Sequence, residues 1–143
     1  MDATSVEALA YLGLLEAQSG RRSEGKAMLR ESLDHATRMG RLSLETRARL
    51  FLAQHAIASQ DAAGALAIAD EIPADTASRS IGPELRALVR YWRGEALRVL
   101  GDEAGSRVER TAARSLIEQI RDRLPEQFRA GFTARRDITT ILR

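Results

Sequence analysis

Few residues in this 143-residue chain have the chemistry for catalysis. There is no cysteine, and His35 and His55 are the only histidines. Their spacing does not match a metal-binding pattern such as H-E-x-x-H, and the segment 20–23 lacks the ending of a phosphate-binding loop. No nucleophile stands beside a base and an orienting acid. We therefore expect a protein that is not an enzyme and that has no metal or cofactor site.

Arginines in the second half of the chain form another group of candidate residues. Splitting the chain at Ser78 gives 8 basic and 11 acidic residues before it and 14 and 9 after it, hence formal charges of −3 and +5. Arg86, Arg90 and Arg93 are spaced to lie within two turns of one helix, where they can bind an acidic peptide or a phosphate. The alternative is a solvated helix face on which acids such as Glu95 pair with these arginines.

The elements that position these residues are predicted to be helices. Hydrophobic residues make up 44% of the sequence but aromatic residues only 4%, which favours closely packed helices with an interior of Ala and Leu. Thr4 or Ser5, Ser43, Asp61 and Asp102 are the expected helix caps. Apolar periodicity, caps and turn residues predict helices over about 4–19, 23–39, 43–59, 61–72, 83–100, 102–123, 126–132 and 136–142, with a loop over 74–82 and Pro83 at a first helical position.

The pattern of small residues repeats about every forty residues. Gly13, Ala53 and Gly94 fall in register, as do the turn residues Gly20, Gln60 and Gly101. The small side chains at positions 13, 53 and 94 let the two helices of a hairpin approach each other closely. Glycine at the turns permits a left-handed helix end, and Gln60 fits that position less well.

This spacing, with the small residues Gly25, Ala65 and Ser106 five places after each turn, resembles the tetratricopeptide repeat, a family of helix-turn-helix solenoids that bind proteins. Three copies cover 6–39, 44–72 and 83–124. The third departs from the pattern, because Arg110 occupies a position where a large apolar residue is expected. The length of the unit and the segment 124–142 are similar to those in bacterial multidomain signalling proteins, namely ATPase-type transcription regulators and Ser/Thr kinases.

The resemblance implies an all-α, right-handed superhelical solenoid of three repeats that forms one domain over 1–143. The segment 125–143 is expected to cover the end of the last repeat with apolar residues from two short helices. Solenoids expose their ends unless these are capped, and the first repeat has no such cap. We therefore expect the chain to be the terminal piece of a longer protein, or its first repeat to pair with a partner.

Aromatic residues occupy equivalent positions in the three copies. Tyr11, Phe51 and Trp92 each stand two residues before the repeated small residue. In this family the first helix of each pair lines the concave face, so the resemblance implies a partner-binding groove. Its expected residues are Tyr11, Leu14, Arg47, Phe51, Leu88, Tyr91 and Trp92. The alternative is that the aromatic residues serve packing between repeats.

The sequence thus predicts a cytoplasmic module that binds a protein or peptide in this groove, with Arg86, Arg90 and Arg93 steering an acidic partner. Three alternatives remain open. They are a homodimer through the first repeat, a weak basic nucleic-acid binder and a domain that senses a small effector. No apolar run approaches the ~20 residues of a membrane span.

Overall fold

The computed structural model describes residues 1–72 and 81–143, and within them all regular secondary structure is helical. The helices belong to two compact units, residues 1–81 and 82–143. The predicted all-α class is therefore confirmed for the described residues. A single domain over 1–143 and a continuous solenoid of three repeats stay predictions, and each unit is described here by itself.

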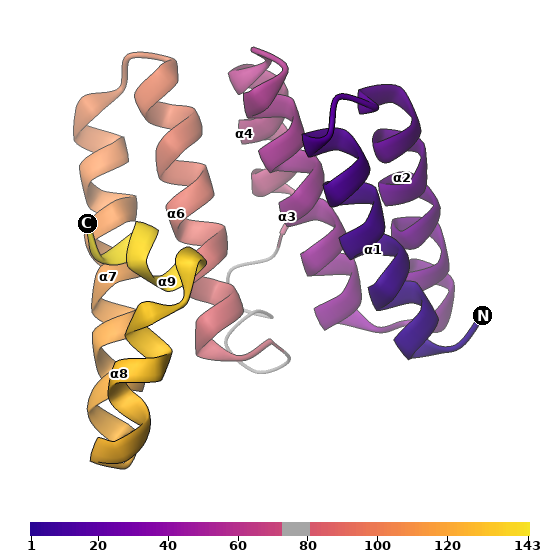
Figure 1. Ribbon diagram of the computed structural model, residues 1–143. Helices are drawn as coiled ribbons and strands as arrows, with labels where there is room; N and C mark the ends of the chain where they lie inside the picture. Colours follow the sequence, from indigo (N-terminus) through magenta and orange to yellow (C-terminus); the bar gives the residue numbers. More distant parts are fainter. Residues whose placement is uncertain (73–80) are drawn as a thin grey trace. The chain divides into compact units, whose positions relative to one another are not determined.

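The first unit consists of two consecutive helical hairpins (Figure 1). Its helices are α1 (Ala3–Gln18), α2 (Arg22–Met39), α3 (Leu42–Ala58) and α4 (Ala62–Asp70). Helix α3 packs against α1 and α2 as well as against its own partner α4. Small and aliphatic side chains are buried in this unit, among them Val6, Ala10, Leu29, Ala36, Ala48, Ala53 and Ala65. The second hairpin thus shares an interface with both helices of the first.

The second unit contains one longer hairpin and two short helices. Its helices are α6 (Pro83–Val99), α7 (Glu103–Arg123), α8 (Glu126–Ala134) and α9 (Arg136–Leu142). Helix α9 packs against both α6 and α7, where Ile138 and Ile141 are buried. Helix α8 contacts α7 and α9, but it has no buried residue, and Phe128 is 55% exposed. Both short helices were expected to cover the last repeat with apolar residues, and of the two only α9 has buried residues.

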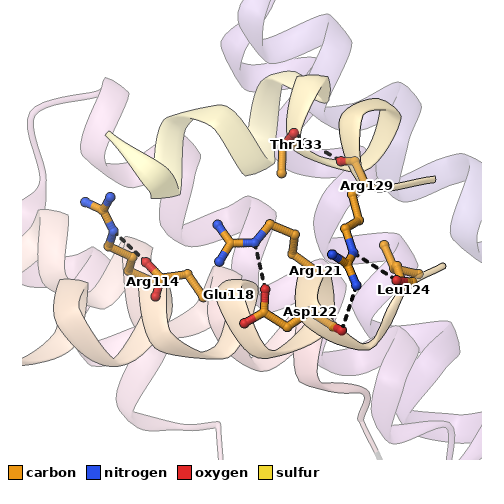
Figure 2. A network of polar contacts seen from close by, with 7 residues as sticks. All are labelled: Arg114, Glu118, Arg121, Asp122, Leu124, Arg129 and Thr133. Atoms are coloured by element: carbon orange, nitrogen blue, oxygen red, sulfur yellow. Dashed lines mark hydrogen bonds and ion pairs between the residues drawn. The ribbon is translucent and has the colours of Figure 1, made fainter. Parts of the chain in front are cut away.

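Polar contacts hold α8 against the end of α7 (Figure 2). The guanidinium of Arg129 donates from Nε to the Leu124 carbonyl at 3.0 Å and from Nη2 to the Asp122 carbonyl at 3.3 Å. The last carbonyl groups of a helix lack partners within the helix and carry partial negative charge, so a cation there is stabilising. The Thr133 hydroxyl donates to the Arg129 carbonyl at 3.1 Å within α8. Helix α8 is therefore fixed by hydrogen bonds rather than by apolar burial.

Three equivalent turns end α1, α3 and α6 in the same way. The left-handed residue has φ of 96° at Gly20, 64° at Gln60 and 90° at Gly101. After each of these, the next N–H reaches back to a carbonyl of the preceding helix: Arg21 to Glu16 at 3.0 Å, Asp61 to Ala56 at 2.8 Å and Asp102 to Leu97 at 2.9 Å. The alignment of Gln60 with the two turn glycines is therefore confirmed. Gln60 is the only non-glycine residue of positive φ among those described.

The small residues of the repeat lie where two helices come closest. A Cβ built on Gly25 would lie 2.5 Å from the Gly13 carbonyl oxygen, a distance that real Cβ atoms do not adopt. A Cβ on Gly13 would lie 3.0 Å from Leu29 Cγ, and one on Gly94 would lie 3.0 Å from Arg110 Cγ. The aliphatic stem of Arg110 thus takes the place in the second unit that Leu29 takes in the first. The repeat pattern predicts a large apolar residue at this position, and Arg110 provides the apolar contact with the methylene groups of its side chain.

Several helix starts agree with the sequence. The carboxylates of Asp61 and Asp102 each accept a hydrogen bond of 2.9 Å, from the backbone N–H of Gly64 and Gly105 respectively. Pro83 is the first residue of α6, where its missing N–H costs nothing. These three predictions are confirmed because each rests on one residue and the backbone directly after it.

Two predicted caps are wrong. Helix α1 is capped by Asp2, whose carboxylate accepts from the Ser5 N–H at 2.8 Å, and neither Thr4 nor Ser5 has that role. The carboxylate accepts a hydrogen bond more strongly than a hydroxyl, and the helix therefore begins earlier. This hydrogen bond lowers the pKa of Asp2. Helix α3 begins at Leu42, so Ser43 lies inside its first turn, and the preceding Arg41 makes no side-chain cap.

Candidate partner-binding surface

Helices α1 and α3 bring residues from equivalent repeat positions together. Tyr11 and Phe51, forty residues apart, form an edge-to-face pair with ring centroids 5.1 Å apart and an interplanar angle of 66°. One turn earlier, Glu7 and Arg47 are also forty residues apart, and their Oε1 and Nε atoms are 3.8 Å apart. On the sides of α1 and α3 that face each other, these two pairs therefore lie in register, each residue of α1 beside its counterpart on α3.

Arg47 is held over the aromatic pair. Its Nη1 donates to the Tyr11 hydroxyl at 2.8 Å, and its guanidinium carbon lies 5.5 Å from the centre of the Tyr11 ring. Arg47 has five N–H donors, and among the described residues one of them is used in this hydrogen bond. The remaining donors can bind a carboxylate or a carbonyl of a ligand. This cation is fixed in place by Tyr11 on one side and by Glu7 on the other.

Exposure separates the residues predicted on α1 and α3. Tyr11 is 43% exposed and Leu14, one turn along α1, is half-buried, whereas Phe51 is 5% exposed. Tyr11 can therefore contact a partner directly, and Phe51 supports the Tyr11 ring from below. The Phe51 ring thus packs within the unit, whereas the Tyr11 ring is partly accessible to solvent.

The remaining predicted groove residues lie on α6, in the second unit. Tyr91 and Trp92 form an edge-to-face pair with centroids 5.2 Å apart and an interplanar angle of 85°, and both are half-buried. Leu88 is 8% exposed. Burial, with a smaller effect of Glu95, raises the pKa of the Tyr91 hydroxyl. A single stripe from Tyr11 to Trp92 involves the arrangement of both units and stays a prediction.

Two arginines of α6 form ion pairs with Glu109, whose role was not predicted from the sequence. Arg90 and Arg93 each donate from Nη1 to Oε1 of Glu109 on α7, at 3.2 and 3.1 Å. Glu109 is 7% exposed, and its other oxygen is buried without a hydrogen-bond partner among the described residues. Two of the three arginines expected to grip a ligand are thus paired within their own unit. Arg86, the third, is half-buried.

A sequence signal for Glu109 exists in the repeat itself. When the three copies are aligned, Glu109 occupies the position that Ile68 and Met28 have in the earlier copies. Its neighbour Arg110 occupies the position of Ala69 and Leu29. A Glu-Arg pair where the earlier copies have two apolar residues indicates that the third hairpin has a polar interior. Glu95, which was considered as a partner of the α6 arginines, pairs with one of them, Arg98, at 3.1 Å.

The two histidines lie on separate helices. The Nε2 of His35 is 3.8 Å from Oε1 of Glu31, one turn away on α2. His55 is on α3, where partial burial and the positive charges of Lys26 and Arg22 lower its pKa. In residues 1–72 and 81–143 no three His, Cys, Asp or Glu side chains are grouped so that they could hold a metal ion. No helix in these ranges is long and apolar enough to cross a membrane.

Comparison with protein-family models, with curated proteins and with solved structures finds no match to this chain.

Proposed function

We propose that this chain is a tetratricopeptide-like helical repeat module that binds a segment of a partner protein on the exposed surface of its first helices. The observation that carries the proposal is the cluster of Tyr11, Arg47 and Phe51 between α1 and α3. It combines a half-exposed aromatic ring with a fixed cation. Interface energy concentrates on aromatic and arginine residues, and here both are already held in place before a partner arrives.

Internal repetition supports the tetratricopeptide-like part of the proposal. The turns at Gly20, Gln60 and Gly101 share one backbone geometry at spacings of forty and forty-one residues. Gly13 and Gly94 occupy equivalent close approaches within their hairpins. In the first unit, α3 packs on both helices of the preceding hairpin, as each repeat of a helical solenoid packs on its neighbour. The right-handed superhelix of three repeats is the extension of this arrangement to the third hairpin.

The cluster determines the kind of segment that fits. An apolar side chain of the partner packs on the exposed edge of Tyr11 and on Leu14, and an adjacent carboxylate accepts hydrogen bonds from Arg47. Glu7 beside Arg47 disfavours a second acid on that side. The preferred segment is therefore an amphipathic helix or extended peptide with one acidic residue next to an apolar one.

The pairing of Arg90 and Arg93 with Glu109 favours this function over nucleic-acid binding. Affinity for nucleic acid requires cations that are free to neutralise phosphates, and Glu109 already offsets part of the charge on α6. By its resemblance, the module belongs to a bacterial signalling or transcription regulator, in which such a surface connects the regulator to another protein.

Selection of binding peptides from a displayed random library tests the proposal. The 143-residue chain should select peptides with an acidic residue next to an apolar one, and Tyr11→Ala and Arg47→Ala should each weaken their binding about tenfold or more. Val108→Ala, which changes a 65% exposed side chain on α7, is the matched control and should leave the binding unchanged. Selection of no peptide, or peptides that bind both variants as tightly as the wild type, would contradict the proposal.

A further inference from the structure

Two isoleucines hold helix α9 on the α6–α7 hairpin. Ile138 is 0% and Ile141 is 5% exposed, and their spacing of three residues puts them on one side of the helix. They are the buried residues of α9, which contacts both α6 and α7. A short helix that buries two apolar side chains against two longer helices is held in the same way as a helical peptide in a groove.

One charged side chain fixes where α9 begins. Arg135 directly precedes α9 and forms an ion pair with Glu84, in the first turn of α6. Its guanidinium also donates to Asp137 Oδ2 at 2.9 Å, and its central carbon lies 5.9 Å from the centre of the Phe132 ring. Residues 135–141 therefore carry both the ionic and the apolar contacts that position α9 on the hairpin.

Helices α8 and α9 form one segment that is connected to α7 at a single break. The Thr139 hydroxyl donates to the Thr133 carbonyl at 2.8 Å and so joins α9 to α8. Between α7 and α8 the backbone is extended, with φ −74° and ψ 144° at Leu124 and φ −53° and ψ 141° at Pro125. Residues at helix ends absorb the rotations of packed elements. Residues 126–143, called the C-terminal segment below, can therefore turn about this break without losing a helix.

Little apolar burial holds the first half of the C-terminal segment. Helix α8 has no buried residue, and Phe128 is 55% exposed. Arg129 attaches α8 to the end of α7 through its hydrogen bonds to the carbonyls of Asp122 and Leu124, which are exposed and which water can replace. Release of the C-terminal segment therefore costs mainly the burial of two isoleucines in α9 and one ion pair.

A second copy of the chain offers the same contacts to this segment. Because the two copies have one sequence, Ile138 and Ile141 of one can be buried on α6 and α7 of the other, and Arg135 of one can pair with Glu84 of the other. The backbone differs between the two arrangements only at the break after α7. Exchange of an identical element is a low-cost route to a dimer for this reason.

We propose that the surface of α6 and α7 beneath α9 is an interaction surface for the C-terminal segment of a second copy of this chain. Two copies then exchange residues 126–143 and form a symmetric dimer. This inference is independent of the proposed peptide binding, which uses α1 and α3.

Size-exclusion chromatography of the 143-residue chain, incubated at high and at low concentration, tests whether the dimer forms. The wild type should yield a dimer at high concentration that returns to monomer after dilution and renewed incubation. A wild type that stays monomeric at every concentration would overturn the proposal.

Exchange of charges between two variants tests whether the C-terminal segment is what the copies share. Glu84→Arg and Arg135→Glu each place like charges across the ion pair, and both side chains are partly exposed, so each variant should still fold. In a mixed dimer the arginine introduced at position 84 meets the glutamate introduced at position 135, and the natural pair forms at the other site. Native mass spectrometry of the mixture should show mixed dimers outnumbering identical ones about fivefold or more, where random pairing gives about equal numbers.

Two controls accompany the mixture. The chain that carries both Glu84→Arg and Arg135→Glu restores the ion pair and should dimerise with itself like the wild type. Arg114→Glu and Glu118→Arg reverse an ion pair that lies within α7, so a mixture of these two variants should pair at random. Random pairing of the Glu84→Arg and Arg135→Glu chains, with both shown to be helical by circular dichroism, would refute exchange of the C-terminal segment.

Discussion

The two units build on the same helical hairpin but cover it differently. In the first unit, the α1–α2 hairpin is packed by a second hairpin, through α3. In the second unit, the α6–α7 hairpin is packed by α8 and α9, which are only 9 and 7 residues long. One side of such a hairpin can therefore be covered either by another hairpin or by a short helical segment.

The hairpin interiors differ in a second way. The first unit buries Gly25 and Leu29 between its helices. At the equivalent positions the second unit has the buried Ser106 and the exposed Arg110, whose side-chain stem lies beside Gly94. The second interior also holds Glu109, which binds two arginines of α6. The backbone of the repeat therefore tolerates either an apolar or a charged interior, provided that the buried charge has partners.

Among the substitutions that test this comparison, Gly25→Ala should have the largest effect on stability. The added methyl group would meet backbone atoms of α1 at 2.5 Å, so α1 and α2 have to move apart, and we expect a loss of about 3 kcal/mol in the free energy of unfolding. Ser106 already has a Cβ at the equivalent position, so Ser106→Ala should cost less than about 1 kcal/mol. Urea unfolding of both variants measures the difference, and equal losses would show that the two close approaches are not distinct.

Glu109→Gln should have the next largest effect. The substitution leaves Arg90 and Arg93 near each other without their shared carboxylate, but both are partly exposed, which reduces the effect to about 1–2 kcal/mol. Glu118→Gln is the matched control on α7, because Glu118 forms one exposed pair with Arg114 at 2.9 Å (Figure 2). It should cost less than about 0.5 kcal/mol. Fluorescence of Trp92 follows unfolding of this unit, and similar losses for the two variants would contradict a special role of Glu109.

Gln60→Gly should stabilise the first unit, by about 1 kcal/mol. Gln60 has a left-handed backbone that costs a residue with a Cβ more than it costs glycine. Gly101→Ala, at the equivalent turn of the second unit, should destabilise that unit by a similar amount. Thermal unfolding monitored by circular dichroism measures both changes. A destabilised Gln60→Gly variant would mean that the flexibility of glycine in the unfolded chain outweighs the relief of strain.

The smallest expected effect is a different pH response of the two units. The pKa of His55 is lowered in the folded state, so its neutral form stabilises the first unit above about pH 6.5, and this contribution is lost as the pH falls. The pKa of Tyr91 is raised, so its contribution to the second unit is present below about pH 10 and is lost as the pH rises further.

Urea unfolding at pH 5 and pH 7.5 should therefore show a smaller loss of stability at pH 5 for His55→Gln than for the wild type. Tyr91→Phe should reduce the loss between pH 9 and pH 11 in the same way. Unchanged pH profiles in both variants would show that neither group is linked to folding.

The sequence predicted those features that depend on a residue and its near neighbours. The turns at Gly20 and Gly101, the caps at Asp61 and Asp102, and the helices α6 to α9 all follow from local chemistry. It did not predict the cap at Asp2, because Asp2, Thr4 and Ser5 can each serve as a cap and the choice among them depends on where the helix begins.

The candidate site was less predictable than the fold. Periodicity placed Tyr11, Arg47 and Phe51 on first helices, but it could not show that the Tyr11 hydroxyl accepts from Arg47 or that Phe51 is nearly buried. Both facts depend on how α1 and α3 pack, which is a contact forty residues apart in the sequence. The pairing of Arg90 and Arg93 with Glu109 was missed for the same reason, because it joins two different helices.

Hydrogen–deuterium exchange of the 143-residue chain, with and without a peptide selected by it, tests the binding surface most directly. We expect slower amide exchange in α1 and α3 around Tyr11 and Arg47, with exchange in α7 and α8 unchanged. Slower exchange confined to α7 and α8, or no change in α1 and α3 at a saturating peptide concentration, would contradict this expectation.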